Sequence, residues 1–296
     1  MKIDYRVVIL PLVALSILST CGKSKSNNLP ELTTYAYVAE DTVRNEVSSS
    51  FFDKDDSLED FPPEVKVLIS IYPDYIIDFK DNYIYFLDGD SLIFDDHKEK
   101  TFTEILDNSS VKDMFSMEYA NLDSIPKYLQ DAGRPRNEYL FKKMYGHSPE
   151  EVSKNLVPVE WFGQKLSFTK VNHASEQLKK VAEELSDNPE LRKYLKSAGT
   201  YYWRKVRGAN RQSAHSYGIA IDIGVDYSDY WLWKYPKAKE EDKIVYANRM
   251  PRQIVEIFRK YGFIWGGAWY HFDTMHFEYR PEILKYSELK TKLLQD

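Results

Sequence analysis

Three residues in the last third of the chain have the side chains and the setting of a metal site. Residues 219–224 alternate isoleucine with Ala, Asp and Gly, so on a β-strand Asp222 faces away from the isoleucines. Residues 276–279 alternate in the same way, which puts His276 on the face opposite two aromatic side chains. Two such strands side by side would bring Asp222 and His276 together. His215, on a turn before the first strand, would complete a three-point site.

The chemistry of this trio is that of a catalytic zinc ion. Two imidazoles and one carboxylate leave the fourth tetrahedral position open, whereas structural zinc sites are closed by protein ligands. Bound zinc lowers the pKa of a water molecule to about 7, so hydroxide is available at neutral pH. The reaction also needs a base that takes the water's proton and passes it to the leaving amine. Asp273, three residues before His276, is the candidate.

These residues lie in two motifs. They are Ser213-Ala-His215-Ser-Tyr-Gly218-Ile-Ala220-Ile-Asp222 and Asp273-Thr-Met-His276. A Ser-x-His-x-x-Gly-x-Ala-x-Asp motif followed by an acid-x-x-His resembles the zinc D-Ala-D-Ala carboxypeptidases of the VanX and VanY type, a family that includes L-Ala-D-Glu endopeptidases. The resemblance covers roughly residues 199–278. The Trp-Gly-Gly-x-Trp segment at 265–269 is more similar to the endopeptidase branch.

The resemblance implies a zinc peptidase that hydrolyses peptidoglycan stem peptides, as a D-Ala-D-Ala carboxypeptidase or an L-Ala-D-Glu endopeptidase. It implies zinc ligands at His215, Asp222 and His276 and the general base at Asp273. Many members have Glu at that last position, so Asp shortens the reach by one methylene group. Glu278, on the same strand face as His276, is the reserve candidate, although a carboxylate so close to a ligand more often supports it.

The resemblance also implies an arginine before the first motif that stabilises the oxyanion. Arg204, Arg207 and Arg211 all precede His215. We favour Arg204, because it follows an aromatic run as the family's arginine does, and Arg211 is the alternative. One fixed donor at such a position contributes roughly 10²- to 10³-fold in rate.

Other side chains near the motifs have two interpretations. His271 is close by sequence, but it is at least as well explained as a cleft-lining residue as by a role in the chemistry. Five tryptophans either line a substrate groove or pack in the core: Trp203, Trp231, Trp233, Trp265 and Trp269.

The expected fold class is α+β. A small antiparallel sheet flanked by helices would carry the metal site on its open face, preceded by a small β-meander and a helical region. Short apolar runs between turn-forming residues predict the meander, at 65–72, 75–79, 83–87 and 92–94. Helical spacing predicts helices within 101–119, 174–198 and 251–261. The proposed domains are an N-terminal α+β region of unknown role, 35–149, and a zinc peptidase domain, 150–296.

The N-terminus has the layout of a bacterial lipoprotein signal peptide, residues 1–21. Two basic residues precede the apolar run 7–18, which is too short to span a bilayer because that takes about 20 residues. The ending resembles a lipobox, in which Cys21 carries the lipid, although Thr20 replaces the usual Gly or Ala. Ordinary secretion with a coincidental cysteine is the alternative.

We therefore expect the protein in the bacterial cell envelope, anchored to a membrane through a lipid on Cys21, on the periplasmic or outer-membrane side. Residues 22–34 are polar and would form a tether.

Net charge and aromatic content limit the classes of molecule that this protein is expected to bind. The formal net charge of -6 argues against nucleic acid. The aromatic share of 15% includes 23 Tyr, which suits a cleft for an extended polar polymer, although Tyr also fills half-buried strand positions. The resemblance described above implies peptidoglycan peptides as the partner. The alternative function is a non-catalytic peptidoglycan-binding or scaffold protein on the same zinc-binding fold, which the Asp at position 273 keeps open.

Overall fold

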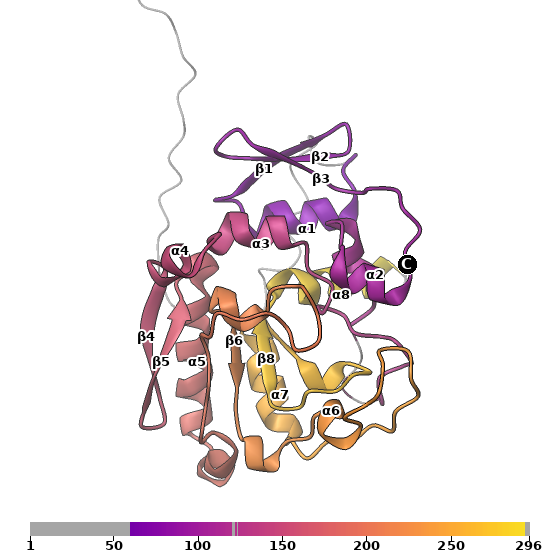
Figure 1. Cartoon of the computed structure of the whole chain (residues 1–296). Helices are drawn as coiled ribbons and strands as arrows, with labels where there is room; N and C mark the ends of the chain where they lie inside the picture. The colour runs from indigo at the N-terminus through magenta and orange to yellow at the C-terminus, as the bar shows by residue number, and fades with distance from the viewer. Residues whose placement is uncertain (1–59, 120–121, 123, 294–296) are drawn as a thin grey trace, which may run out of the picture. The chain divides into compact units, whose positions relative to one another are not determined.

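The computed structural model describes residues 60–119, 122 and 124–293, which belong to one compact unit (Figure 1). The predicted signal peptide, the tether and Cys21 lie outside these residues. Among the helices formed by the described residues, none is long and apolar enough to cross a membrane.

A three-stranded antiparallel sheet lies at the centre of the C-terminal half. Its order is β6 (Ala220–Asp222), β8 (His276–Tyr279) and β7 (Phe263–Trp265). The register places Asp222 opposite His276 and Ile221 opposite Phe277. The two alternating stretches are therefore neighbouring strands, with their apolar residues on one face and their polar residues on the other. The predicted α+β class, with a small antiparallel sheet flanked by helices, is confirmed.

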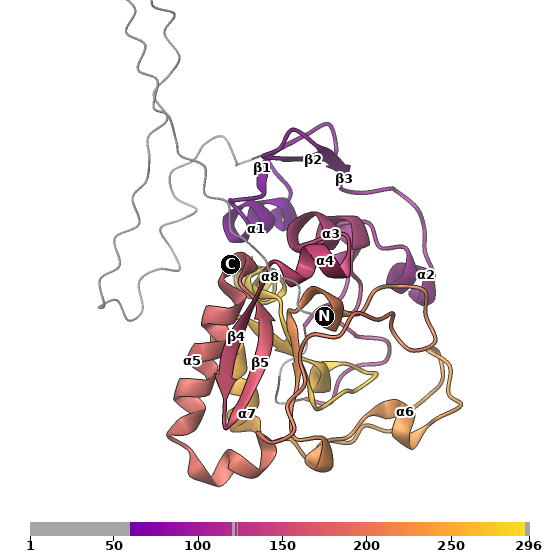
Figure 2. The same cartoon turned by 60° about the vertical axis from the view of Figure 1, so that its left-hand side comes forward.

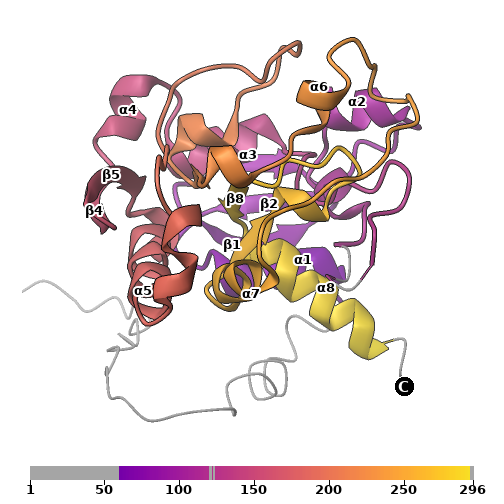
Figure 3. The ribbon, with the colours of Figure 1, turned by 90° about the horizontal axis from the view of Figure 1, so that it is seen from below.

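Helices cover the apolar face of this sheet. Helix α7 (Arg252–Lys260) lies beside α5 (Ala174–Ser186), as Figures 1 and 3 show. Phe258 of α7 stacks on Phe277 of β8 with ring centroids 4.0 Å apart, and both side chains are fully buried. This packing fixes β8 from behind and leaves its opposite face for polar side chains.

The helix predictions in this half are largely confirmed. Helix α7 falls within 251–261, and Gly262, at φ +88°, donates to the Arg259 carbonyl at 3.0 Å where the helix ends. The 174–198 stretch forms α5 and then, after Asn188, the 3₁₀ turn η4 (Pro189–Tyr194). The helical segment ends at Tyr194, before Gly199. Gly199 instead pairs with Asp222 as an isolated antiparallel bridge, so it borders β6.

A β-hairpin that the sequence analysis did not predict lies beside α5 (Figure 2). Strands β4 (Leu156–Trp161) and β5 (Gln164–Thr169) pair antiparallel, and Phe162 and Gly163 turn the chain with positive φ values of 43° and 86°. Its alternating apolar residues are buried: Val159, Trp161, Leu166 and Phe168. This alternation was the available signal, obscured by Pro158 within the first strand.

The N-terminal meander is confirmed as β1 (Ile76–Lys80), β2 (Tyr83–Phe86) and β3 (Ser91–Ile93). Its turns fall at the predicted residues: Asp81, Asn82 and Gly89 all have positive φ. The turn chemistry therefore identified the ends of these strands correctly.

The apolar run 65–72 is mostly a helix and not a strand of the meander, so that part of the prediction is wrong. Helix α1 spans Pro63–Ile71, with Pro63 in its first turn. Val65, Leu68 and Tyr72 are buried at helical spacing. This spacing and the Pro at the helix start outweigh the β-branched composition of the run.

The 101–119 stretch forms α2 (Phe102–Asp107) and the 3₁₀ turn η2 (Lys112–Phe115), with a break between them. Thr101 and Glu104 form a reciprocal capping box at the start of α2. The remaining helices are α3 (Glu138–Tyr145), α4 (Pro149–Ser153), α6 (Trp231–Lys234) and α8 (Pro281–Leu293).

The regions before and after residue 150 share one hydrophobic core. Helix α1 packs against α8, and the Tyr119 hydroxyl accepts a hydrogen bond from the Trp265 backbone N–H at 2.9 Å. The Trp269 indole donates to the Ala132 carbonyl at 2.7 Å. The N-terminal region therefore supports the segment that leads to β8.

We predict that Phe258→Ala lowers the free energy of unfolding by about 3–5 kcal/mol, because it leaves a cavity under Phe277. Urea unfolding followed by fluorescence measures this change. Leu87→Ala is the control: Leu87 is 68% exposed, and its loss should cost less than about 0.5 kcal/mol. Equal losses in the two variants would contradict the packing described here.

Candidate metal centre

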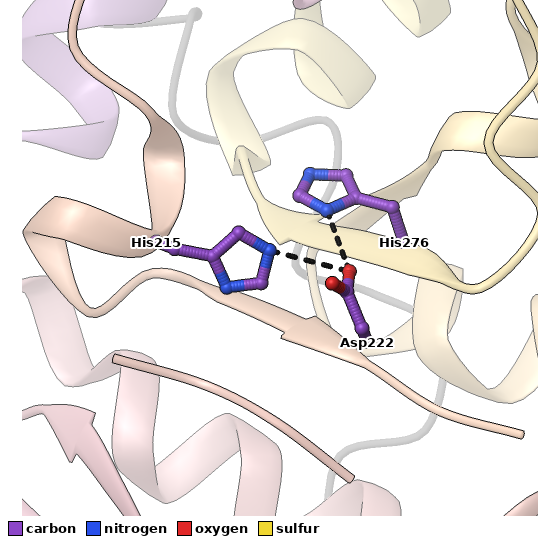
Figure 4. Close-up of side chains that lie close together, drawn as sticks. All are labelled: His215, Asp222 and His276. Carbon is purple, nitrogen blue, oxygen red and sulfur yellow. Dashed lines mark hydrogen bonds and ion pairs between the residues drawn. The ribbon is translucent and has the colours of Figure 1, made fainter. Parts of the chain in front are cut away.

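The three predicted ligand residues meet at one point (Figure 4). The Asp222 Oδ1 atom lies 2.9 Å from His276 Nδ1 and 3.2 Å from His215 Nε2. One ligand atom from each residue lies within 4.8 Å of the others. The fold therefore brings His276 next to Asp222, which lies 54 residues earlier in the chain, and next to His215, which lies earlier still.

Local backbone features place each member of the trio. Asp222 and His276 are opposite each other in the β6–β8 register. His215 lies in the 3₁₀ turn η5 (Ala214–Tyr217), which ends at Gly218 with φ +68°. A Cβ on Gly218 would lie 2.5 Å from the Leu156 side chain, so both the backbone angle and the space favour glycine here.

The second nitrogen of each histidine has its own acceptor. His215 Nδ1 lies 2.6 Å from the Thr200 carbonyl oxygen and must donate its proton there, because a carbonyl only accepts. His276 Nε2 lies 3.4 Å from Glu278 Oε2 and donates to that carboxylate. In the neutral rings, the lone pairs of His215 Nε2 and His276 Nδ1 therefore point toward the Asp222 carboxylate.

Three electron-pair donors that converge on one point favour a cation between them. Two imidazole nitrogens and one carboxylate oxygen, with the remaining direction open to a cleft, match the ligand set of catalytic zinc sites. Outer groups that hold the far nitrogen of each histidine are a regular part of such sites. The residues present therefore fit a divalent metal ion.

The electrostatics of the trio agree with this fit. Burial lowers the pKa of His276, but the bonds to Asp222 and Glu278 outweigh it and raise that pKa to about 10. Burial alone raises the pKa of Asp222, yet His215 and His276 hold it well below its usual range. The site thus strongly stabilises positive charge next to the Asp222 carboxylate.

Asp273 lies beside the trio in the same cleft. Its carboxyl group is buried, and Oδ1 has no hydrogen-bond partner among the described residues. Burial, followed by the charge of Asp222, raises the pKa of Asp273 to about 7, although His276, His215 and Arg204 act in the opposite direction. A carboxyl group with this pKa can both accept and release a proton near neutral pH.

Glu278, the reserve candidate for the base, lies between two arginines. Its side chain is fully buried, with one oxygen 3.3 Å from Arg136 Nη1 and the other 3.1 Å from Arg280 Nη1. Burial raises its pKa, but Arg136, the bond to His276 and Arg280 lower it to about 2. Glu278 therefore stays ionised and orients the His276 ring.

Of the three arginines considered from the sequence, Arg204 lies in the cleft near Asp273. Its backbone is fixed by Ser216, whose hydroxyl accepts from the Arg204 N–H at 2.9 Å, while its side chain is exposed at the cleft. Its charge lowers the pKa of Asp273, so the two groups are close. Arg211 is buried and paired with Asp107, which occupies part of its guanidinium. Arg207 also lines the cleft and is exposed.

The cleft has a volume of about 420 Å³. Three of the five tryptophans line it, Trp231, Trp233 and Trp269, while Trp265 is buried against Phe277. Trp233 is 53% exposed, so it offers a free aromatic surface at the rim. The groove interpretation therefore fits Trp233 best, since Trp231 and Trp269 are almost fully buried.

His271 lines the cleft but takes no part in the trio. Its Nδ1 lies 2.5 Å from Asp131 Oδ2, and its Nε2 donates to the Glu240 carbonyl oxygen at 2.7 Å. Asp131, Glu240 and His271 also form a group with metal-ligating atoms. Arg134 already bonds to both carboxylates of that group, at 2.6 Å and 2.8 Å, so the group belongs to a buried ion-pair network.

Two cleft residues were missed in the sequence analysis. Arg134 and Arg136 reach the cleft from the segment before α3, more than a hundred residues before His276. The sequence showed only a Gly-Arg-Pro-Arg segment that marks a change of region. No local pattern connects that segment with β8, so a single sequence gave no signal for their place in the site.

The segment that carries the trio is similar to a known peptidase family. Residues 207–279 match a family model described as D-alanyl-D-alanine carboxypeptidase. The match includes the whole trio and Asp273. Neither a curated protein nor a solved structure gave a significant match.

We predict that His276→Ala abolishes stoichiometric metal binding, because it removes one of three ligands. Glu278→Gln should weaken the metal affinity by about 10- to 100-fold, because the charge that orients His276 is lost. Competition with a chromogenic chelator and elemental analysis measure both effects. His173→Ala is the control, since the His173 side chain is 70% exposed, pairs with Glu176 and lies outside the cleft. Unchanged affinity in His276→Ala would rule out this metal centre.

Proposed function

We propose that this protein is a zinc-dependent peptidase that hydrolyses peptidoglycan stem peptides, at a D-Ala-D-Ala or an L-Ala-D-Glu bond. The observation that carries the proposal is the convergence of His215, Asp222 and His276 beside a buried carboxyl group whose pKa is about 7. The family match supports peptide hydrolysis, and the ligand set supports zinc.

A zinc ion held by the trio would supply a Lewis acid that makes water nucleophilic at neutral pH. Residues of the protein transfer the proton, stabilise the developing charge and orient the metal ligands. Asp273 accepts the proton of the attacking water and returns it to the leaving amine, a role for which its pKa is suited. Arg204 offers guanidinium donors to the negative charge that develops on the scissile carbonyl oxygen. Glu278 and the Thr200 carbonyl keep both imidazoles in the productive tautomer.

The cleft suits a peptide from the cell wall. Its lining combines arginines with aromatic side chains, so it offers donors for carboxylates and flat surfaces for apolar groups. Stem peptides carry carboxylates and short alanyl side chains, which match this lining.

We further propose that the protein works at a membrane surface in the bacterial cell envelope. The layout of residues 1–21 and the position of Cys21 support a lipid anchor. Cys21→Ala should move the protein from the membrane fraction to the soluble fraction of bacterial cells, as judged by immunoblotting after ultracentrifugation. A variant that stays with the membrane in high salt would contradict the anchor.

We predict that the purified protein releases new free amino groups from peptidoglycan and that a chelator stops this release. Asp273→Asn should lower kcat by about 10²- to 10⁴-fold with the metal content unchanged, because it removes the proton acceptor and keeps its shape. Mass spectrometry of the released peptides identifies the bond, and elemental analysis reports the metal.

Asp226→Asn serves as the control, because Asp226 is exposed and lies outside the cleft. Its kcat should equal that of the wild type. Full activity in Asp273→Asn would exclude Asp273 as the base. The absence of any chelator-sensitive cleavage would refute the peptidase and favour a wall-binding protein on the same fold.

A further inference from the structure

Arg136 is a buried cation in the wall of the cleft. Its side chain is 10% exposed, and it lines the same cavity as His215, Asp222, His276 and Asp273. It is two contacts away from the metal centre, because its partner Glu278 also accepts from His276. A guanidinium in such a place needs negative charge nearby to offset the cost of its burial.

The other buried arginines of the cleft have that charge. Arg134 bonds to Asp131 at 2.6 Å and to Glu240 at 2.8 Å. Arg211 pairs with Asp107. Each of these side chains therefore has a carboxylate close to its charge within the protein.

The carboxylate that pairs with Arg136 is also bonded to other groups. Glu278 lies 3.3 Å from Arg136, but it also lies 3.1 Å from Arg280 and accepts from His276. A single negative charge thus faces two guanidinium groups and an imidazole. Arg280 is also paired with Glu282, so Arg136 is the guanidinium of this group that has no carboxylate of its own.

The hydrogen-bond donors of Arg136 are also incompletely used. Nη1 donates to the Gly133 carbonyl at 3.2 Å and to Glu278. Within the described part of the chain, Nε and Nη2 have no hydrogen-bond partner. Burial lowers the pKa of Arg136, Glu278 opposes this change, and the neighbouring Arg280 and Arg211 reinforce it. These observations agree that the buried guanidinium has no carboxylate of its own.

We propose that Arg136 binds a carboxylate of the substrate peptide and thereby helps to determine which peptides the enzyme accepts. The guanidinium fork is suited to a planar carboxylate, and a partly dehydrated site strengthens the bond. This inference rests on the proposed peptidase function for the nature of the ligand. The carboxylate is either the free C-terminus of the peptide or an internal acidic group, and the two sources can be separated by experiment.

The test measures binding separately from cleavage. Calorimetry gives the Kd of synthetic peptides for the metal-loaded, full-length Asp273→Asn protein, with and without Arg136→Gln. Three peptides are compared: L-Ala-D-Glu-L-Lys-D-Ala-D-Ala, the same peptide with a C-terminal amide, and the same peptide with D-Gln in place of D-Glu. Cleavage of the first peptide by the protein with Asp273 intact is measured in parallel.

We expect Arg136→Gln to raise the Kd of the parent peptide by about 10- to 100-fold, the effect of one charge-assisted hydrogen-bond pair. If the C-terminal carboxylate is the ligand, the amide peptide already binds weakly and loses nothing further in the variant. If the internal carboxylate is the ligand, the D-Gln peptide shows this behaviour instead. A Kd of the parent peptide that Arg136→Gln leaves unchanged overturns the proposal, whether or not cleavage occurs.

Two controls separate recognition from folding. Arg136→Lys keeps the charge and should retain part of the preference for the carboxylate but lose the fork geometry. Arg192→Gln makes the same change as Arg136→Gln at an exposed arginine outside the cleft, and it should leave the ratio of acid to amide binding within twofold. Metal content and the midpoint of thermal unfolding confirm that each variant is folded. Binding that depends on Arg136 without cleavage would reject the peptidase function alone.

Discussion

The register between two short strands is the constraint on which the site depends. Because Asp222 and His276 are opposite each other across β6 and β8, their side chains meet without any long connecting loop. A shift of one residue would turn one of them to the apolar face, where Phe258 stacks on Phe277. The hydrophobic packing behind the sheet therefore also fixes the position of the polar groups in front of it.

Charge is distributed around the site in a connected series. Glu278 joins His276 to Arg136 and Arg280, and Arg280 continues to Glu282 deeper in the core. Glu278 contacts two arginines and a histidine, while Glu282 contacts Arg280 and accepts a hydrogen bond from the Tyr72 hydroxyl. Buried charges of this kind are stable only when they stay paired, so substitutions at these positions affect both folding and the orientation of the metal ligands.

The sequence was sufficient to predict the structure where the pattern lies within a few consecutive residues. Alternation in 219–224 and 276–279 predicted two strands and the faces on which their side chains lie, and the turn residues of the meander marked its strand ends. It was insufficient where neighbours are far apart in the chain. Arg136 reaches Glu278 across 142 residues, and nothing near either residue indicates the other. In the run 65–72, β-branched composition and helical spacing disagreed, and contacts with the rest of the core favoured the helix.

The extended segment between Gly199 and Arg204 connects two functional groups through backbone bonds alone. One end pairs with Asp222, the carbonyl of Thr200 orients His215, and the other end is bound to Ser216. Because both ends are fixed, the segment has no spare length. An insertion or deletion inside it would therefore change the distance between Arg204 and the metal ligands. Length variation among natural homologues should therefore concentrate after Lys205, in the turn that closes at Gln212, where the chain can lengthen without moving either group.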